Sequence, residues 1–459
     1  MRKIRKSLIA LLTAMVLVAA ACSDTTDDGA EVDASEGTDE TTESEAEEPS
    51  EEEPSEEETT GDEPAEEEEA APAAVMSGGT DRDFSVLAPA TGETIVVGLV
   101  NTEGPAGLDF PEIRTLGAAT VQYLNDHGGF GGRVVQLETC NADGSPEGSQ
   151  ACAQELAGKD VEMVFLGLDL FPDYATYDAE GINVIGAIPL FPADYAAEVV
   201  YLSGGNFLLN AGIVGVAIEE FGASSVAIVS GDNAGQNSSE AALIEVLEAN
   251  EIEFVSIKGG NDETDAGFQA LVSQALNSEP DVLVSLYGDA GCIGMMRGRA
   301  ALGTDIPVLA SNTCIAADVL EAAGDAADGW FFVGGADEPV TVEHASQQAA
   351  AAIEVGGAPE DVVISSLGLG NLSQIMFLTT AAAANDLAAG GGEITGESVY
   401  DHLLNNPNGD LRVFPGGAVL DCGAVAASPS VCNWETPIGE YADGGAPRLT
   451  RLDVTPFLP

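Results

Sequence analysis

The sequence predicts an α/β protein with two doubly wound lobes, in which helices cover both faces of each parallel sheet. From Thr94 onward, short β-branched apolar runs alternate with longer stretches of helical periodicity. Such strand–helix–strand units build parallel sheets that are buried on both faces. The alternation restarts after the segment 201–207, which favours two lobes over one very wide sheet.

The first series begins with a strand at 94–100. The helix expected at 111–127 starts with a proline and repeats apolar residues at mixed spacings of three and four. Further elements follow in the same alternating order. We expect strands at 133–139, 161–167 and 182–188, and a helix at 146–158.

The second series repeats this alternation. It predicts helices at 208–221, 240–250, 266–276 and about 292–302, and strands at 225–231, 253–258, 281–288, 306–312 and 329–335. Later helices, at about 342–355, 373–389 and 396–404, can complete the first lobe, so the chain should cross between the lobes more than once. From Leu411 the chain is strand-like and rich in loops. We assign lobe 1 to about 92–205 and 340–408, and lobe 2 to about 206–339 and 409–459.

Residues 1–22 have the pattern of a lipoprotein signal peptide. A basic start precedes an apolar run from Leu8 to Val18 and small residues up to Cys22. The apolar run is short for a membrane span. Cys22 would be the first mature residue and would carry the lipid, although Ala19 stands where such signals usually have Leu. The alternative is an ordinary secretory signal with an incidental cysteine.

Residues 23–79 contain no Lys or Arg and are rich in Glu, Asp, Ser, Thr and Pro. Such a segment buries too little apolar surface to offset its ordering entropy, and its like charges extend it. We therefore expect a disordered acidic tether between the lipid and the folded region at 80–459. The formal net charge of the whole chain is −64, which disfavours nucleic acid and anionic membrane surfaces as partners.

Six cysteines remain if Cys22 is lipidated, and an even number in an oxidising compartment indicates disulfides. They fall along the chain as three couples that are close in sequence. We predict the bonds Cys140–Cys152, Cys292–Cys314 and Cys422–Cys432. No C-x-x-C occurs and the three histidines are scattered, so the sequence predicts neither a zinc site nor a cofactor.

The glycine-rich stretch Gly128–Gly132 raises the question of a phosphate-binding loop. Such loops follow a strand and open a helix, because the helix N-terminus offers free N–H groups. Here the order is reversed, since the glycines follow a helix and precede a strand. A glycine in the left-handed conformation ends a helix, so we interpret this stretch as a helix stop.

The same region resembles the type I periplasmic binding proteins, and more closely the substrate-binding lipoproteins of branched-chain amino acid ABC transporters (Leu/Ile/Val-binding protein-like). In that family the first strand leads into a Gly-Pro turn, the first helix ends in Asn-x-x-Gly-Gly-x-x-Gly, and the second strand leads to an Asp and a helix opened by Pro. The matching residues are Gly104, Pro105, Asn125, Gly128, Gly129, Gly132, Asp143 and Pro146. The similarity covers about 94–404.

The resemblance implies two lobes joined by a hinge, with a small-molecule ligand held between them at the carboxyl ends of the strands. The closed form would dock on the permease subunits of an importer at the outer face of the cytoplasmic membrane. It also implies a monomer without catalytic activity. The alternative is a ligand-sensing or interaction receptor with the same clamp that feeds no transporter. An enzyme has little support, because no Gly-x-Ser-x-Gly motif occurs and the histidines have no matched nucleophile.

The candidate ligand residues lie in loops that follow strands. In lobe 1 they are Asn101, Thr102, Glu103, Leu168, Asp169 and Ile188, and in lobe 2 they are Asp232, Asn233, Gln236, Tyr287, Asp289, Asn312 and Thr313. The competing interpretation of each Asp, Asn or Thr is a helix cap or turn residue.

The sequence departs from the family where amino acid specificity arises. Asp169 stands among positions where amino acid binders hold a carboxylate, and it would repel that group unless it is turned away. Ala234-Gly235 replaces the frequent Tyr-Gly, and Asn312 or Thr313 stands where an acidic residue often meets the ligand ammonium. An amino acid stays within the expected range, but a neutral or cationic polar compound, such as an amide or a urea-like or polyamine-like molecule, suits these acidic loops better than a free carboxylate.

Overall fold

The computed structural model describes residues 83–104, 109–260, 263–315, 317–334, 348, 350–358, 369–413, 417–442 and 448–459. The expected leader with Cys22, the acidic segment 23–79 and Pro105 lie outside the described residues, as does much of the helix expected at 342–355. The expectations for those segments remain predictions.

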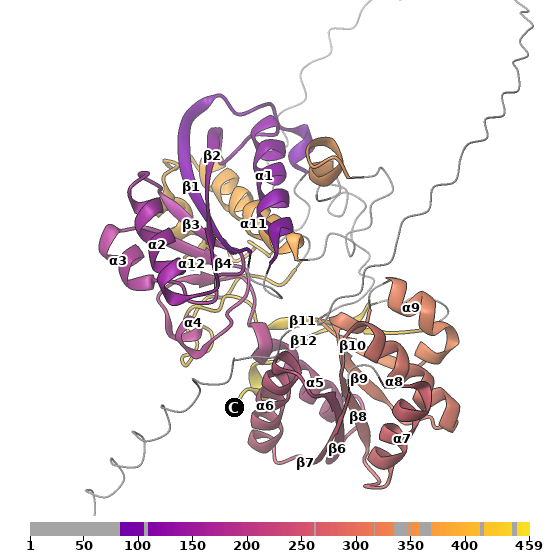
Figure 1. The fold of residues 1–459 in the computed structure, drawn as a ribbon. Coiled ribbons are helices and arrows are strands. Elements are labelled where there is room, and N and C mark those ends of the chain that lie inside the picture. Colours follow the sequence, from indigo (N-terminus) through magenta and orange to yellow (C-terminus); the bar gives the residue numbers. More distant parts are fainter. Residues whose placement is uncertain are drawn as a thin grey trace, which may run out of the picture. The chain divides into compact units, whose positions relative to one another are not determined.

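The first lobe is built on a five-stranded sheet of order β2-β1-β3-β4-β5, in which all neighbours pair in parallel (Figure 1). The strands are β1 (Gly92–Thr102), β2 (Arg133–Ala142), β3 (Met163–Leu166), β4 (Asn183–Gly186) and β5 (Val200–Tyr201). Helices connect them and return to this lobe late in the chain. These are α1 (Pro111–Asp126), α2 (Pro146–Ala157), α3 (Tyr174–Glu180), α4 (Pro192–Ala196), α11 (Gly370–Ala389) and α12 (Gly396–Asn405).

Strand β3 shows that this sheet is covered on both faces. Met163 and Phe165 belong to a core that contains residues of α1, α11 and α12, whereas Val164 and Leu166 belong to a core that contains residues of α2. Successive side chains of a strand point to opposite faces. The ring centroids of Phe165 and Phe377 of α11 are 4.4 Å apart. The doubly wound arrangement predicted from the sequence is therefore confirmed in this lobe.

The second lobe is built on a seven-stranded sheet of order β12-β11-β10-β9-β8-β6-β7. Strands β6 (Ser225–Gly231), β7 (Glu253–Gly259), β8 (Val282–Leu286), β9 (Val308–Ser311) and β10 (Trp330–Val333) are parallel. Strands β11 (Glu435–Glu440) and β12 (Arg448–Asp453) add an antiparallel edge. The helices are α5 (Gly205–Glu219), α6 (Ala234–Ala249), α7 (Asp265–Leu276), α8 (Asp289–Leu302) and α9 (Ala317–Ala323).

Some local expectations differ from the structure. The short helices α3, α4 and α9 were not expected, and α6 starts at Ala234 rather than at 240. Within the helix expected at 342–355, residues 351–355 form a π-helical turn. The expected second part of lobe 2 began at 409, but Leu411 and Leu420 are buried in the core of lobe 1.

All three predicted disulfides are present. The Cα atoms are 5.5 Å apart in Cys140–Cys152, which joins β2 to α2, and in Cys292–Cys314, which joins α8 to the turn after β9. The third bond, Cys422–Cys432, lies just before the chain enters β11. Closing loops of this size stabilises a fold by about 3 kcal/mol in the chain-entropy model.

The Gly128–Gly132 stretch ends α1, as predicted. The Gly129 N–H donates to the carbonyl oxygen of Leu124 at 2.7 Å, and Gly129 has a φ of +58°. Asn125 then binds the next strand with both side-chain atoms, accepting from the Val135 N–H at 2.7 Å and donating to its carbonyl oxygen at 2.9 Å. The stretch is thus a helix stop that sets the start of β2.

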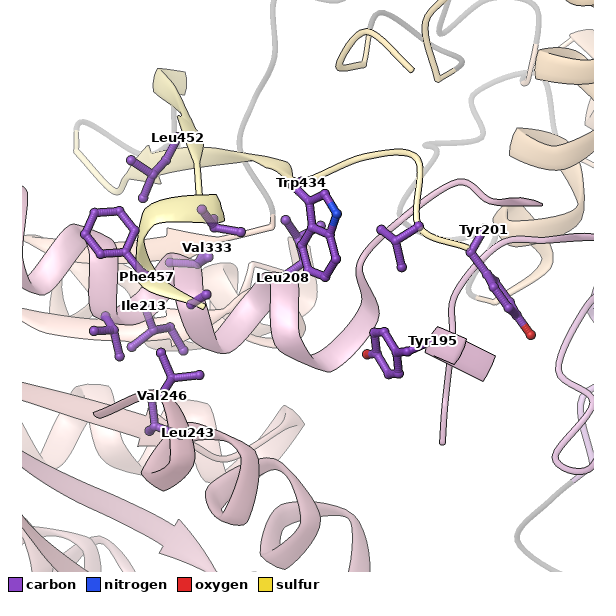
Figure 2. Packing of buried hydrophobic residues seen from close by; sticks show 14 of the residues in the cluster. Tyr195, Tyr201, Leu208, Ile213, Leu243, Val246, Val333, Trp434, Leu452 and Phe457 are labelled. Atoms are coloured by element: carbon purple, nitrogen blue, oxygen red, sulfur yellow. The ribbon is translucent and has the colours of Figure 1, made fainter. Parts of the chain in front are cut away.

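Two of the segments that cross between the lobes are hydrogen-bonded to each other. The Tyr201 N–H donates to the Ser430 carbonyl oxygen at 2.7 Å, and the Cys432 N–H donates to the Tyr201 carbonyl oxygen at 2.9 Å. Trp434 and Leu208 pack together at this point, as Figure 2 shows, and a Cβ on Gly204 would lie within 3 Å of both. The hinge therefore contains two packed, hydrogen-bonded segments rather than a loose linker.

We expect Gly205→Ala to destabilise the hinge. Gly205 has a φ of +57°, and a Cβ there would lie 2.5 Å from the Pro189 carbonyl oxygen. Gly222 is a matched control, because its φ is +58° but a Cβ would meet no atom within 4 Å. Gly222→Ala should cost only the left-handed backbone penalty, about 1–2 kcal/mol, and Gly205→Ala clearly more. Urea denaturation measures both free energies of unfolding, and equal losses would refute the steric argument.

Candidate functional site

The carboxyl ends of parallel strands meet at one edge of a sheet, where α/β proteins bind their ligands. In lobe 1 the loops after β1, β3 and β4 form this edge, which we call the lobe 1 edge (101–104, 167–173 and 187–191). Buried Asn101 connects these loops. Its amide donates to the Phe110 carbonyl oxygen at 2.7 Å, and its Oδ1 accepts the Leu168 N–H at 3.2 Å. All six lobe 1 candidates, Asn101, Thr102, Glu103, Leu168, Asp169 and Ile188, lie on this edge.

Glu103 is ion-paired rather than free. Arg114 of α1 donates to its two carboxylate oxygens at 2.8 and 3.0 Å, and Asn141 donates at 3.2 Å. The hydrogen bond to Glu103 raises the pKa of Arg114. A ligand carboxylate would have to compete with this glutamate for Arg114.

Asp169 is turned away from solvent, with only 4% of its surface exposed. Its Oδ1 accepts from the Ser149 hydroxyl of α2 and from the Phe171 N–H at 3.2 Å. Burial raises the pKa of Asp169, the two hydrogen bonds lower it, and nearby Asp194 raises it further. This carboxyl therefore supports the loop from beneath and offers little surface to a ligand.

Asp194 supports the neighbouring loop in the same way. Its Oδ2 accepts the N–H groups of Leu190 and Phe191 at 2.7 and 2.8 Å. Its Oδ1 accepts from the Tyr174 hydroxyl at 2.7 Å, which in turn lies 2.7 Å from the Tyr201 hydroxyl. Burial raises the pKa of both tyrosines far above its usual range. The network joins the lobe 1 edge to the start of the hinge.

The two loops held by Asp169 and Asp194 each expose a phenylalanine that the sequence patterns did not indicate as a ligand residue. Phe171 and Phe191 are 41% and 43% exposed and stack at a centroid distance of 5.8 Å with an angle of 8° between the rings. A signal was available in the sequence, because Leu-Phe-Pro occurs at 170–172 and again at 190–192, each time after a buried strand.

In lobe 2 the corresponding edge follows β6, β8 and β9, and we call it the lobe 2 edge. Asn233 is exposed and caps α6, where its Oδ1 accepts the Gln236 N–H at 2.9 Å. Asn312 and Thr313 are also exposed, and the Thr313 hydroxyl donates to the Tyr287 carbonyl oxygen at 3.3 Å. Asp289 is the first residue of α8.

Tyr287 points into lobe 2 rather than out of it. Its side chain is 2% exposed and packs edge-on against Phe268, and its hydroxyl has no hydrogen-bond partner among the described residues. Burial, together with Glu263, raises its pKa to about 12. Tyr287, one of the candidate ligand residues, therefore offers little surface to a ligand in this arrangement.

The basic group beside the lobe 2 strand ends is also paired. Lys258 of β7 forms an ion pair with Glu240 of α6, which is 6% exposed and also accepts from the Ser230 hydroxyl at 2.6 Å. Its hydrogen bonds with Lys258 and two serines outweigh burial and lower the pKa of Glu240. Arg114 and Lys258 thus each hold a nearly buried glutamate.

A cavity of about 730 Å³ lies elsewhere on lobe 1. It is lined by α3, α4, α12 and residues 181–184, at the amino end of β4. It therefore lies away from the carboxyl ends of the strands. Within the described ranges, no three His, Cys, Asp or Glu residues gather as metal ligands, and no helix is long and apolar enough to cross a membrane.

Two α/β lobes, a paired hinge and polar loops at the strand ends define a protein of the type I periplasmic binding fold. The chain belongs to the periplasmic binding protein family, whose model matches residues 94–419. A comparison with curated proteins finds no match.

Solved structures of substrate-binding proteins share this fold. An ABC transporter substrate-binding protein from Sphaerobacter thermophilus is 20% identical, with a TM-score of 0.57, 79% of this chain covered and 98% of that chain. A putative branched-chain amino acid ABC transporter protein from Rhodospirillum rubrum is 17% identical, with a TM-score of 0.58 and coverages of 78% and 100%. The protein LivJ from Streptococcus pneumoniae, solved with isoleucine, is 14% identical, with a TM-score of 0.52 and coverages of 78% and 99%. At these identities the likeness establishes the fold alone.

Replacing Asp169 by Asn should change how stability depends on pH. A carboxyl whose pKa is raised above 3.8 by folding binds its proton more tightly in the folded state. The contribution of Asp169 to the free energy of unfolding therefore falls as the pH rises from about 3.8 through the folded pKa, by about 1.4 kcal/mol per unit of pKa difference. Asp169→Asn lacks this titration. The free energy of unfolding of the variant minus that of wild type should therefore increase as the pH is raised from 4 to 7.

Urea titrations at several pH values measure this difference. Asp178→Asn, an exposed position on α3, is the control for loss of one carboxylate. If the difference between wild type and Asp169→Asn is the same at pH 4 and pH 7, Asp169 is not the buried acid described above.

Proposed function

We propose that the chain is the solute-binding lipoprotein of an ABC importer and binds a small polar ligand between its lobes by closing about the hinge. The main support is the presence of two parallel sheets with polar strand-end loops in a chain of the periplasmic binding protein family. Open α/β sheets bind ligands at such edges, and hinged domains close around them. An extracytoplasmic location follows from the same family.

Within this proposal the predicted residues divide into two groups. The exposed or half-buried ones, which we assign to ligand contact, are Leu168, Ile188, Asn233 and Asn312. Glu103, whose side chain is 9% exposed and paired with Arg114, would instead hold its loop in place. The buried ones, Thr102, Asp169 and Tyr287, would support the loops that make the contacts. Asp289, at the start of α8, would lie beside them.

The lipid on Cys22 and the acidic segment 23–79 would keep the receptor near its permease. A flexible tether raises the local concentration of the folded region at the membrane. Its strong negative charge would keep this segment away from anionic headgroups. The protein would act as a monomer, because one chain supplies both lobes.

A ligand screen tests the binding function. The Cys22→Ser chain would be titrated with amino acids, amides, urea, polyamines, sugars and aromatic compounds while its thermal midpoint is followed. A ligand at one hundred times its Kd should add about 2.7 kcal/mol of stability, which shifts the midpoint by several degrees. Calorimetry would confirm one site per chain. If folded, oxidised protein responds to no compound in a broad panel, the solute-receptor proposal loses its basis.

Lipidation is tested separately. We expect wild type to fractionate with membranes and to carry a lipid on an N-terminal Cys22 by mass spectrometry, whereas Cys22→Ser should be soluble or retain its leader. A wild-type protein that is released freely and cleaved at another position would point to the ordinary secretory signal.

A further inference from the structure

The lobe 1 edge exposes an aromatic surface that the proposed function leaves without a role. Among the described residues, five large apolar side chains are markedly exposed, and Phe171 and Phe191 are the two aromatic ones. They come from consecutive strand-end loops, after β3 and β4, and stack with nearly parallel rings. Scattered exposed apolar residues are ordinary, but a stacked pair on a ligand-binding edge forms one continuous apolar surface.

A buried carboxylate holds the backbone of each phenylalanine. Each backbone N–H donates to a buried carboxylate, Phe171 to Asp169 at 3.2 Å and Phe191 to Asp194 at 2.8 Å. Each is followed by proline, which restricts the preceding residue to extended conformations, and Phe191 has φ −126° and ψ 162°. The proline and the buried carboxylate thus each restrict the backbone at both Leu-Phe-Pro segments, although Phe191 caps α4 and Phe171 precedes the cap of α3.

This rigidity points to recognition rather than to incidental exposure. Burying a carboxylate is unfavourable unless hydrogen bonds satisfy it, and here two buried carboxylates accept the backbone N–H groups of the two exposed phenylalanines. A ring held in one orientation loses little conformational entropy when a ligand stacks on it. Aromatic pairs prefer offset-stacked geometry with centroids 4.5–7 Å apart, and the observed pair at 5.8 Å already has it.

We propose that Phe171 and Phe191 form a platform for a planar aromatic ring of the ligand. The ligand class is then an aromatic ring that carries an uncharged or cationic polar group, rather than a small aliphatic amino acid. The polar group would meet the exposed Asn312 and Thr313 on the lobe 2 edge. A free carboxylate is disfavoured because Arg114 and Lys258 already hold Glu103 and Glu240. This inference rests on the proposed function, since it identifies the ligand of that site.

The test compares two sets of probes on the Cys22→Ser chain. The aromatic set contains benzamide, tyramine, phenethylamine, indole and benzoate, and the aliphatic set contains leucine, isoleucine, glutamine, urea and putrescine. We expect binding within the aromatic set, with amides and amines bound more tightly than benzoate. Calorimetry measures each Kd.

Variants then locate the contact. Phe171→Ala and Phe191→Ala should each raise the Kd of the best aromatic probe by about five- to thirtyfold, the usual effect of losing one stacked ring. Phe171→Tyr and Phe191→Tyr keep a ring and should bind within about threefold of wild type. Val255→Ala removes an equally exposed apolar side chain from β7 and should leave the Kd unchanged. Circular dichroism and the thermal midpoint of each variant verify folding.

The outcomes separate the inference from the proposed function. If only aliphatic probes bind, and the double variant Phe171→Ala/Phe191→Ala binds them like wild type, the platform is refuted and the solute receptor stands. If the double variant changes X-ray scattering of the ligand-free protein but no aromatic Kd, the pair is an interlobe contact and the platform is again refuted. If no probe of either set binds, both proposals are contradicted.

Discussion

The burial of the central strands of both sheets on both faces is the constraint on which the rest of the structure depends. Strand β3 places Met163 and Phe165 in one core and Val164 and Leu166 in another, and β6 likewise divides its residues between two cores. These strand faces are not accessible to a ligand. The residues that determine ligand binding can therefore vary only in the loops at the sheet edges, where the strands end. The polar, charged and exposed aromatic groups relevant to function are therefore found in the loops after β1, β3, β4, β6, β8 and β9.

A loop can recognise a ligand only if its conformation is fixed, and lobe 1 fixes its loops with buried acids. Asp169 and Asp194 each accept at least one backbone N–H from the adjacent loop and one hydroxyl hydrogen bond, from Ser149 and Tyr174 respectively, while Oδ2 of Asp169 has no partner among the described residues. Removing such a partner would leave a buried acceptor unsatisfied, which costs more than the hydrogen bond itself contributes. The same network includes the Tyr201 hydroxyl, and the Tyr201 backbone pairs with the second crossing segment. The conformation of the loops is therefore linked to that of the hinge.

Sequence periodicity was sufficient to predict the long helices and strands, but not how the side chains of the site are oriented. Each lobe's alternation, the Gly128–Gly132 helix stop and the three disulfides follow from local patterns and spacing. Helices α3 and α4 have seven and five residues, too few for a periodic signal. The direction of Tyr287 was also hidden, because it follows a strand that is buried on both faces and has no polar alternation. Nor could the sequence show that Asp169 faces inward.

The acidic surplus of the chain restricts its ligands in two ways. It sets the net charge, and it also supplies acidic partners for the basic side chains. In a protein with 78 acidic and 14 basic residues, a basic group at a strand end already has an acidic partner. Arg114 holds Glu103, whose side chain is 9% exposed, and Lys258 holds Glu240, at 7%. A ligand carboxylate that displaced either glutamate would leave it nearly buried and uncompensated, which is strongly unfavourable. Apolar stacking and neutral hydrogen bonds escape this competition, so an acidic chain of this fold gains affinity most readily through exposed rings and amides.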